Sequence, residues 1–228
     1  MLFDIDGTLI ATGGAGQRAM NRAFDDVFGI PDAFAGLELA GRTDSSILTD
    51  AFAGQGLAPS RPAVAAFRAR YGECLAEEVA SDGNGKRVMP GIARLLEQLS
   101  SERSTFLALL TGNYAEAARI KLEHFRLWQY FRCGAFGEDS HDRNHLVPVA
   151  VERARAAGLP EQGEACRVVV IGDTPRDVAC AAAHGARSIA VATGPYPGER
   201  LSRAGADVVF EDLADTVAVL DALRALFR

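Results

Sequence analysis

The chain has 228 residues, enough for one full-sized domain or for a core domain with a smaller insert. Its formal net charge is −6 and no segment is strongly basic, so a nucleic-acid partner is not expected. No apolar run approaches the roughly 20 residues of a membrane span, and the first residues lack the basic cluster of a signal peptide. We therefore expect a cytoplasmic protein with no membrane partner.

Short apolar segments that alternate with amphipathic helices run through most of the chain. The first predicted strand covers residues 1–5 and begins at Met1 itself, which leaves open a start a few residues upstream. Later strands are expected at 105–110, 132–136, 167–171, 187–192 and 207–210. Helices with one apolar face are expected at 92–99, 145–157 and 213–226. This alternation predicts an α/β fold with a parallel, Rossmann-like sheet and helices on both faces.

The stretch from residue 14 to 85 breaks the alternation, because it has helical apolar faces and no good strand. We therefore predict an α/β core of residues 1–13 and 86–228, with an all-helical cap of residues 14–85 inserted after the first strand. Such a cap would lie over the carboxyl end of that strand, where open parallel sheets bind ligands. The segment SDGNGKR at 81–87 would be the flexible return hinge.

Two acids, Asp4 and Asp6, end the first strand, and Gly7 would bend the chain away. Adjacent carboxylates repel each other, which a cation or a bound proton would relieve. One acid could then act as a nucleophile while the other donates and accepts protons. For this pair alone, a solvated pair of turn acids is an equally good interpretation.

The segment GDTPRD follows a later strand and places Asp173 at the strand end and Asp177 in the first turn of the next helix. Carboxylate oxygens at this edge of the sheet suit Mg²⁺, which takes one or two protein carboxylates and keeps several waters. The alternative is that both acids simply stabilise the helix N-terminus.

The segment LLTGN at 109–113 also joins a strand to a helix. Thr111 offers a hydroxyl, and Gly112 and Asn113 offer backbone N–H groups that could bind phosphate. For this segment alone, an ordinary helix start is the favoured interpretation.

A phosphate site also needs a basic residue. The two lysines are Lys86, in the expected hinge, and Lys121, well inside a helix. Arg143 precedes the helix at 145–157 and is the better placed candidate, although an isolated arginine carries no meaning by itself.

Together these segments resemble the four motifs of the haloacid dehalogenase-like hydrolases. The matching residues are DIDGT at 4–8, LLTGN at 109–113, Arg143 and GDTPRD at 172–177, in the family's order and spacing. The resemblance covers essentially the whole chain and looks closest to the phosphoglycolate-phosphatase-like group with an α-helical cap. The family usually has lysine at the third motif, where this chain has Arg143, but a guanidinium can also bind phosphate.

The resemblance implies a magnesium-dependent phosphatase that acts on a small phosphorylated metabolite, phosphoglycolate-like or a sugar phosphate, through an aspartyl-phosphate. Asp4 would attack phosphorus, while Asp6 would protonate the leaving alcohol and then activate water. Thr111 and Arg143 would hold the phosphoryl oxygens, with Gly112 and Asn113 beside them.

The resemblance also implies a set of metal ligands. Mg²⁺ would be held by Asp4, by Asp6 through its backbone carbonyl, and by Asp173. Asp177 would support the metal waters or orient its neighbours.

Arg42 lies in the loop LELAGRTD between the first two cap helices. It could face the core and bind a second anionic group of the substrate. The alternative, slightly favoured, is that Arg42 is solvated or pairs with Asp44 or Glu38.

Two other functions remain open from the sequence. A sugar-phosphate mutase of the same superfamily would also keep both acids of the first motif. A non-catalytic binding protein on the same fold is less compatible with the complete set of polar residues. The four cysteines, Cys74, Cys133, Cys166 and Cys180, have no disulfide spacing, so we expect reduced thiols. Neither the substrate's identity nor the oligomeric state is predicted.

Overall fold

The computed structural model describes residues 1–159 and 167–227, and its main sheet has six parallel strands in the order β5–β4–β1–β6–β7–β8. These strands are β1 (Leu2–Phe3), β4 (Ala108–Leu110), β5 (Gly134–Ala135), β6 (Val169–Gly172), β7 (Arg187–Val191) and β8 (Val208–Phe210). Each overlaps one of the six predicted segments, so the expected parallel α/β core is confirmed. Among the described residues, no helix combines the length and apolar composition needed to cross a membrane.

Helices cover both faces of this sheet because successive strand residues point to opposite faces. Phe3 and Ile171 point to one face, and Leu2 and Val170 point to the other. The first face is covered by α4 (Ile92–Ser101), α5 (Ala115–His124) and α9 (Thr216–Ala225). The second face is covered by α6 (Leu146–Ala156), α7 (Pro175–Ala182) and α8 (Gly198–Arg203). Two short 3₁₀ helices, η1 (Trp128–Tyr130) and η2 (Arg143–His145), complete the core.

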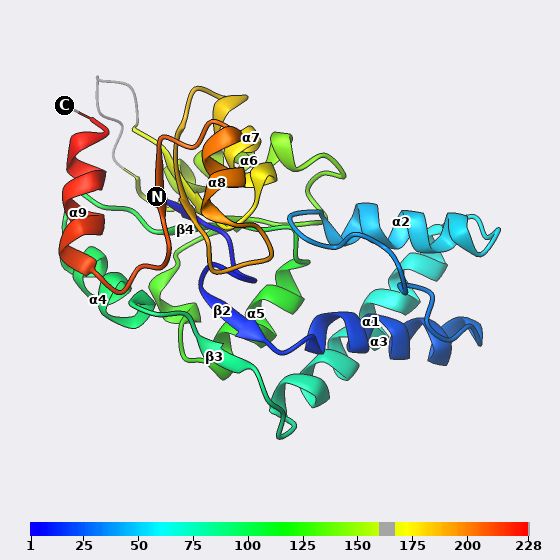
Figure 1. Ribbon diagram of the computed structural model, residues 1–228. Helices are drawn as coiled ribbons and strands as arrows, with labels where there is room; N and C mark the ends of the chain where they lie inside the picture. Colours follow the sequence, from blue (N-terminus) through cyan, green and yellow to red (C-terminus); the bar gives the residue numbers. More distant parts are fainter. Residues whose placement is uncertain (160–166, 228) are drawn as a thin grey trace.

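Three further helices lie between residues 14 and 85, the range that we propose as the cap. They are α1 (Ala15–Phe28), α2 (Asp44–Gly54) and α3 (Arg61–Ala80), and Figure 1 shows them together on one side of the sheet. Their own apolar cluster centres on aromatic rings: the Phe24 ring centroid lies 5.3 Å from that of Phe52 and 6.1 Å from that of Phe67. Tyr114, at the start of α5, is buried in the same cluster, so these helices rest on α5.

A two-stranded antiparallel sheet, which the sequence analysis did not predict, joins the cap helices to the core. It pairs β2 (Ile10–Thr12) with β3 (Lys86–Val88), so the chain enters and leaves the cap side by side. The predicted flexible hinge at 81–87 was therefore partly wrong, because β3 begins inside it. Lys86 is also held there: its ammonium donates to the carbonyls of Glu78 and Val79, at 2.6 and 3.0 Å, at the end of α3.

Candidate active site

The order of the strands brings the sequence motifs together. β1 lies between β4 and β6, with Phe3 paired to both Leu109 and Ile171, so the three carboxyl ends lie side by side. The chain runs from β1 to β4 on one side and returns to β6 on the other. In open α/β sheets, the crevice at such a switch in strand order is the usual binding site. Asp4, Thr111 and Asp173 each follow one of these three strands directly.

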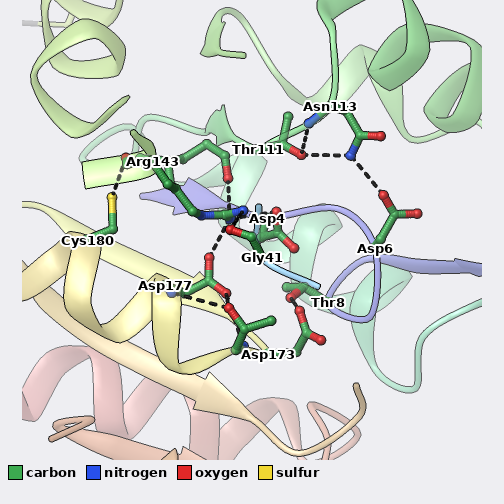
Figure 2. Close-up of polar contacts among 12 residues, drawn as sticks. Asp4, Asp6, Thr8, Gly41, Thr111, Asn113, Arg143, Asp173, Asp177 and Cys180 are labelled. Atoms are coloured by element: carbon green, nitrogen blue, oxygen red, sulfur yellow. Dashed lines mark hydrogen bonds and ion pairs between the residues drawn. The ribbon is translucent and has the colours of Figure 1, made fainter. Parts of the chain in front are cut away.

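Arg143 links the acids of two motifs. Its Nη2 donates to Asp4 Oδ1 at 2.8 Å and to Asp177 Oδ1 at 2.5 Å, and all three side chains are buried (Figure 2). Burial raises the pKa of Asp4 from 3.8 to about 6, although the Arg143 charge opposes this. Asp177 and Asp4 raise the pKa of the guanidinium even though burial lowers it, so Arg143 stays charged.

Three buried carboxylates form the floor of the site. Asp4, Asp173 and Asp177 each offer an oxygen within 4.8 Å of the others. Burial, followed by repulsion from Asp4 and Asp177, raises the pKa of Asp173 well above its usual range. A Cβ at Gly194 would lie 1.7 Å from Asp173 Oδ2, so only glycine allows this close approach. Because Arg143 supplies one positive charge among three acids, the cluster favours a bound cation.

Asp6 points away from this cluster and belongs to a second polar group (Figure 2). Asn113 Nδ2 donates to Asp6 Oδ2 at 2.8 Å and to Thr111 Oγ1 at 2.9 Å. The Lys121 ammonium donates to Asp6 Oδ2 and to Asn113 Oδ1, both at 2.6 Å. The Asp6 side chain is 44% exposed while that of Lys121 is 4% exposed, so a buried cation holds an accessible carboxylate.

Residues 1–191 match the family described as haloacid dehalogenase-like hydrolase. The chain belongs to this family. It is 30% identical over 218 residues to a phosphoglycolate phosphatase of Rhodospirillum rubrum, covering 94% of this chain and 87% of that protein. It is 27% identical over 227 residues to the tyrosine-protein kinase PtkA of Mycobacterium tuberculosis, covering 98% of this chain and 70% of that one.

Solved structures agree with this hydrolase fold. CbbY from Rhodobacter sphaeroides, in complex with phosphate, superposes with a TM-score of 0.69 at 22% identity, over 96% of this chain and 97% of that one. A putative beta-phosphoglucomutase from Thermotoga maritima superposes with a TM-score of 0.59 at 22% identity, over 96% and 97%. These likenesses show the fold, and the family and its phosphatase members identify the chain as a phosphatase, a phosphoric monoester hydrolase.

The acid cluster of this hydrolase fits a hard divalent cation, and its hydrogen bonds indicate which acids would hold it. Asp177 Oδ2 accepts from the N–H and hydroxyl of Thr174, at 3.0 and 2.7 Å, while its Oδ1 accepts from Arg143. Asp4 and Asp173 each accept a side-chain hydrogen bond on one oxygen only, from Arg143 and Thr8 respectively. Asp173 Oδ2 accepts from no described residue and is available to a metal, and Asp4 Oδ1, which accepts one hydrogen bond, keeps a second lone pair for the same ion.

Gly112 and Asn113 of the hydrolase lie in the turn between β4 and α5, and the cap contacts this turn. Gly112 O accepts from the backbone N–H of Asp44 at 2.7 Å, and a Cβ at Gly112 would lie 1.8 Å from Arg42 O. Asp44 Oδ2 in turn accepts from the N–H of Tyr114 at 2.8 Å. Burial raises the pKa of Asp44 from 3.8 to about 7, although the charge of Lys121 opposes this.

Arg42 borders the cavity between cap and core, but its charge is already paired. Its Nη2 lies 2.7 Å from Asp50 Oδ2, and its Nη1 donates to the backbone carbonyl of Glu38 at 3.5 Å. The acid that it contacts is therefore Asp50, and neither of the two acids considered from the sequence supplies its carboxylate. The cavity has a volume of about 570 Å³, with Asp4, Asp6 and Lys121 on its core side and Met20, Arg42 and Tyr71 on its cap side.

Lys121 is the site residue that the sequence analysis set aside. It lies in the second half of α5, where no motif marks it. The signal that could have identified it is its position among buried residues, because Ala117, Ala118 and Leu122 on the same helix are all buried. A lysine on an apolar helix face is rarely left without a partner.

Proposed function

We propose that this phosphatase is magnesium-dependent and hydrolyses a small phosphorylated metabolite, phosphoglycolate-like or a sugar phosphate, through an aspartyl-phosphate on Asp4. The observation that carries the proposal is the position of Asp4. Its Oδ1 is held by Arg143, its Oδ2 accepts from no described residue, and it borders the cavity between cap and core. A carboxylate fixed by one oxygen presents the other to an incoming phosphorus atom.

Asp4 acts as the nucleophile, and Asp6 acts as the general acid and base. Asp4 Oδ2 attacks phosphorus as the bond to the leaving oxygen breaks, and Asp6 gives that oxygen its proton. Asp6 then takes a proton from water, which attacks the same phosphorus and releases Asp4 and inorganic phosphate. The contacts of Lys121 and Asn113 keep the Asp6 carboxylate at the cavity wall, where it can serve in both steps.

The phosphoryl oxygens would be held by Thr111, Arg143 and the backbone of Gly112 and Asn113. Thr111 Oγ1 accepts from the N–H and the side-chain amide of Asn113, at 3.3 and 2.9 Å. Its own hydrogen therefore remains available to donate to phosphate. Arg143 supplies the positive charge that offsets the phosphoryl oxygens.

Asp4 and Asp173 would hold Mg²⁺ together with the backbone carbonyl of Asp6, and Asp177 would orient Arg143 and support the metal waters. Bound there, Mg²⁺ would neutralise negative charge on the phosphate and on the acid cluster.

The relatives support hydrolysis as the leading reaction. The phosphatase from R. rubrum aligns with nearly the whole chain. A sugar-phosphate mutase stays a second candidate, but no contact among the described residues of this site favours phosphoryl transfer between substrates over hydrolysis. Membership of a hydrolase family, with polar residues of all four motifs around one cavity or beside it, disfavours the non-catalytic alternative. A cytoplasmic location stays a prediction: Cys74, Cys133 and Cys180 are free thiols, and Cys166 lies outside the described residues.

The test uses p-nitrophenyl phosphate with and without Mg²⁺. We expect turnover that vanishes in chelator and returns with Mg²⁺, and we expect Asp4→Asn to abolish it because an amide is a poor nucleophile. Asp82→Asn, an exposed acid in the loop after α3, is the matched control and should turn over like the parent. Activity of Asp4→Asn within tenfold of the parent would falsify the nucleophile assignment. Full activity after exhaustive metal removal would contradict the role of Asp173.

A further inference from the structure

Four cationic side chains border the cavity between cap and core, and three of them are committed to acids. Arg143 contacts Asp4 and Asp177, Lys121 contacts Asp6, and Arg42 contacts Asp50. The fourth, Arg87, is exposed and makes no hydrogen bond or ion pair within residues 1–159 and 167–227. Its charge is thus free to meet an anion that enters the cavity.

Among the three residues of β3, Arg87 borders the cavity and its two neighbours do not. Side chains of directly paired antiparallel residues point to the same face, and those of successive residues to opposite faces. Arg87 pairs with Ala11, and both border the cavity, as do the other two residues of β2, Ile10 and Thr12. The neighbouring β3 residues, Lys86 and Val88, do not border it, and the Lys86 ammonium is held at the end of α3.

A second polar group on the cap side of the cavity also lacks a partner. The Tyr71 side chain on α3 is 2% exposed, and its hydroxyl has no hydrogen-bond partner among the described residues. A Cβ at Gly16 would lie 3.9 Å from Tyr71 Oη and 3.5 Å from Lys121 Nζ, which places both polar groups beside the same glycine. Buried hydroxyls normally find a partner, so this one indicates a ligand that supplies it.

We propose that Tyr71 and Arg87 form a subsite for the leaving group of the substrate, and that this group carries hydroxyls and a second anionic group. Tyr71 would hydrogen-bond a hydroxyl near the ester, and Arg87 would bind the distant anion. The substrate class is then a phosphorylated sugar acid or a sugar bisphosphate, which share this chemistry. The proposal rests on the phosphatase function above and narrows its substrate.

The size of the cavity supports a substrate of this class. Its volume of about 570 Å³ lies within the range of about 300–1,000 Å³ that is typical of sites for ligands much larger than a two-carbon acid. Arg87 suits the distant anion better than Arg42, because binding to Arg42 would first have to displace Asp50. A guanidinium without a partner can bind carboxylate or phosphate with two hydrogen bonds.

The experiment compares KM and kcat for two matched pairs of esters: glucose 6-phosphate with 6-phosphogluconate, and fructose 6-phosphate with fructose 1,6-bisphosphate. In at least one pair the parent should have the lower KM for the doubly anionic ester, and the responding pair identifies the anion as carboxylate or phosphate. Arg87→Gln should raise that KM about tenfold, for the loss of one charge-assisted contact, and leave kcat within twofold. The KM of the singly anionic ester divided by that of the doubly anionic ester should therefore fall about tenfold. The control Arg94→Gln, which changes an exposed arginine on α4, should leave this ratio unchanged.

Tyr71→Phe tests the other half of the subsite. It should raise KM for both members of the responding pair by about fivefold, because both carry the hydroxyl that Tyr71 binds. Its melting temperature should not fall, since the change removes a buried hydroxyl without a protein partner. Tyr130→Phe, a tyrosine on η1 away from the cavity, is the control.

Three outcomes would overturn the proposal. A parent without preference in either pair, or an Arg87→Gln effect that is equal within the pair, removes Arg87 from the subsite. A Tyr71→Phe variant with unchanged KM values removes Tyr71. These failures differ from failure of the proposed function, which would appear as a parent that does not hydrolyse p-nitrophenyl phosphate with Mg²⁺, and the subsite would then fall with it.

Discussion

Each acid of the first motif has its own cation. Arg143 contacts Asp4 in the buried cluster, and Lys121 contacts Asp6 at the cavity wall. The two cations reach the site from opposite faces of the sheet, since η2 packs with α6 and α7 whereas α5 covers the other face. In the proposed mechanism, Arg143 would hold the attacking carboxylate and the phosphate, and Lys121 would position the carboxylate that carries protons.

Lys121→Met tests the second assignment at the level of one residue. The change keeps the length of the side chain but removes both 2.6 Å contacts, so Asp6 loses its fixed position. We expect kcat to fall about 10- to 100-fold with little change in KM, as when a group that acts mainly in the transition state is displaced. Lys121→Arg should recover part of the loss. Steady-state kinetics on p-nitrophenyl phosphate measure both.

The control for Lys121→Met is Lys86→Met. Lys86 binds carbonyls at the end of α3, so its loss should lower stability and leave kcat near that of the parent. If Lys121→Met also keeps the kcat of the parent, Lys121 has only a packing role.

At the scale of secondary-structure elements, Asp44 joins the first turn of α2 to the start of α5. Its N–H donates to Gly112 O, and its carboxylate accepts from the N–H of Tyr114. The residue therefore connects a cap helix to the segment that would hold phosphate. Burial in this position raises the pKa of its carboxyl to about 7.

This raised pKa predicts a dependence of stability on pH. The native state binds the Asp44 proton more tightly than the unfolded chain does, so the stabilisation is present at low pH and is lost as pH rises from about 4 to about 7. Between pH 5 and pH 8, the parent should lose about 2–3 kcal/mol more unfolding free energy than Asp44→Asn. Denaturant unfolding at pH 5 and pH 8 measures the two free energies of unfolding for each protein. The contributions of Asp4 and Asp173 to the pH dependence cancel in the comparison, because the parent and Asp44→Asn both contain these residues. Equal losses would show that Asp44 titrates normally.

The residues that could be predicted best from the sequence are those at the carboxyl ends of the strands. Asp4, Thr111 and Asp173 could be placed together without coordinates, because parallel strands end at one edge of a sheet. The contacts that were missed depend on how distant elements pack. Lys121 reaches Asp6 because α5 packs on the sheet face that carries Phe3. Arg42 contacts Asp50, which lies within α2. β2 and β3 have three residues each and pair across more than 70 positions, too short for a periodic pattern to appear.

At the scale of the whole molecule, negative charge is concentrated where a cation would bind. The cluster of Asp4, Asp173 and Asp177 is stabilised in part by Arg143, while the chain as a whole carries a formal charge of −6. Two partly exposed ion pairs also join the cap to the core. Arg176 on α7 contacts Glu38, and Arg68 on α3 contacts Glu138.

Mg²⁺ should therefore stabilise the folded protein as well as activate it. A ligand that binds only the native state at 100 times its Kd contributes about 2.7 kcal/mol, which should raise Tm by roughly 5–10 °C in a chain of this size. Asp173→Asn should lose most of this shift, and its metal-free Tm should exceed that of the parent because the change removes a carboxyl whose ionised form is disfavoured by burial and by the neighbouring acids. Thermal unfolding with Mg²⁺, or with chelator at matched ionic strength, gives both values. An equal Mg²⁺ shift in Asp173→Asn would place the cation elsewhere.

The antiparallel pairing of β2 with β3 has a consequence for how such a protein can change over evolution. Because Thr12 is paired with Lys86, the backbone leaves the core and returns to it at neighbouring positions. A two-residue hairpin turn is enough to join antiparallel strands in this register. Loss or exchange of the helical segment would therefore leave the order of the core strands unchanged, although Gly112 and Tyr114 would lose their contacts with Asp44. Of the proposed subsite, Tyr71 on α3 would leave with the helical segment, whereas Arg87 on β3 would stay with the sheet.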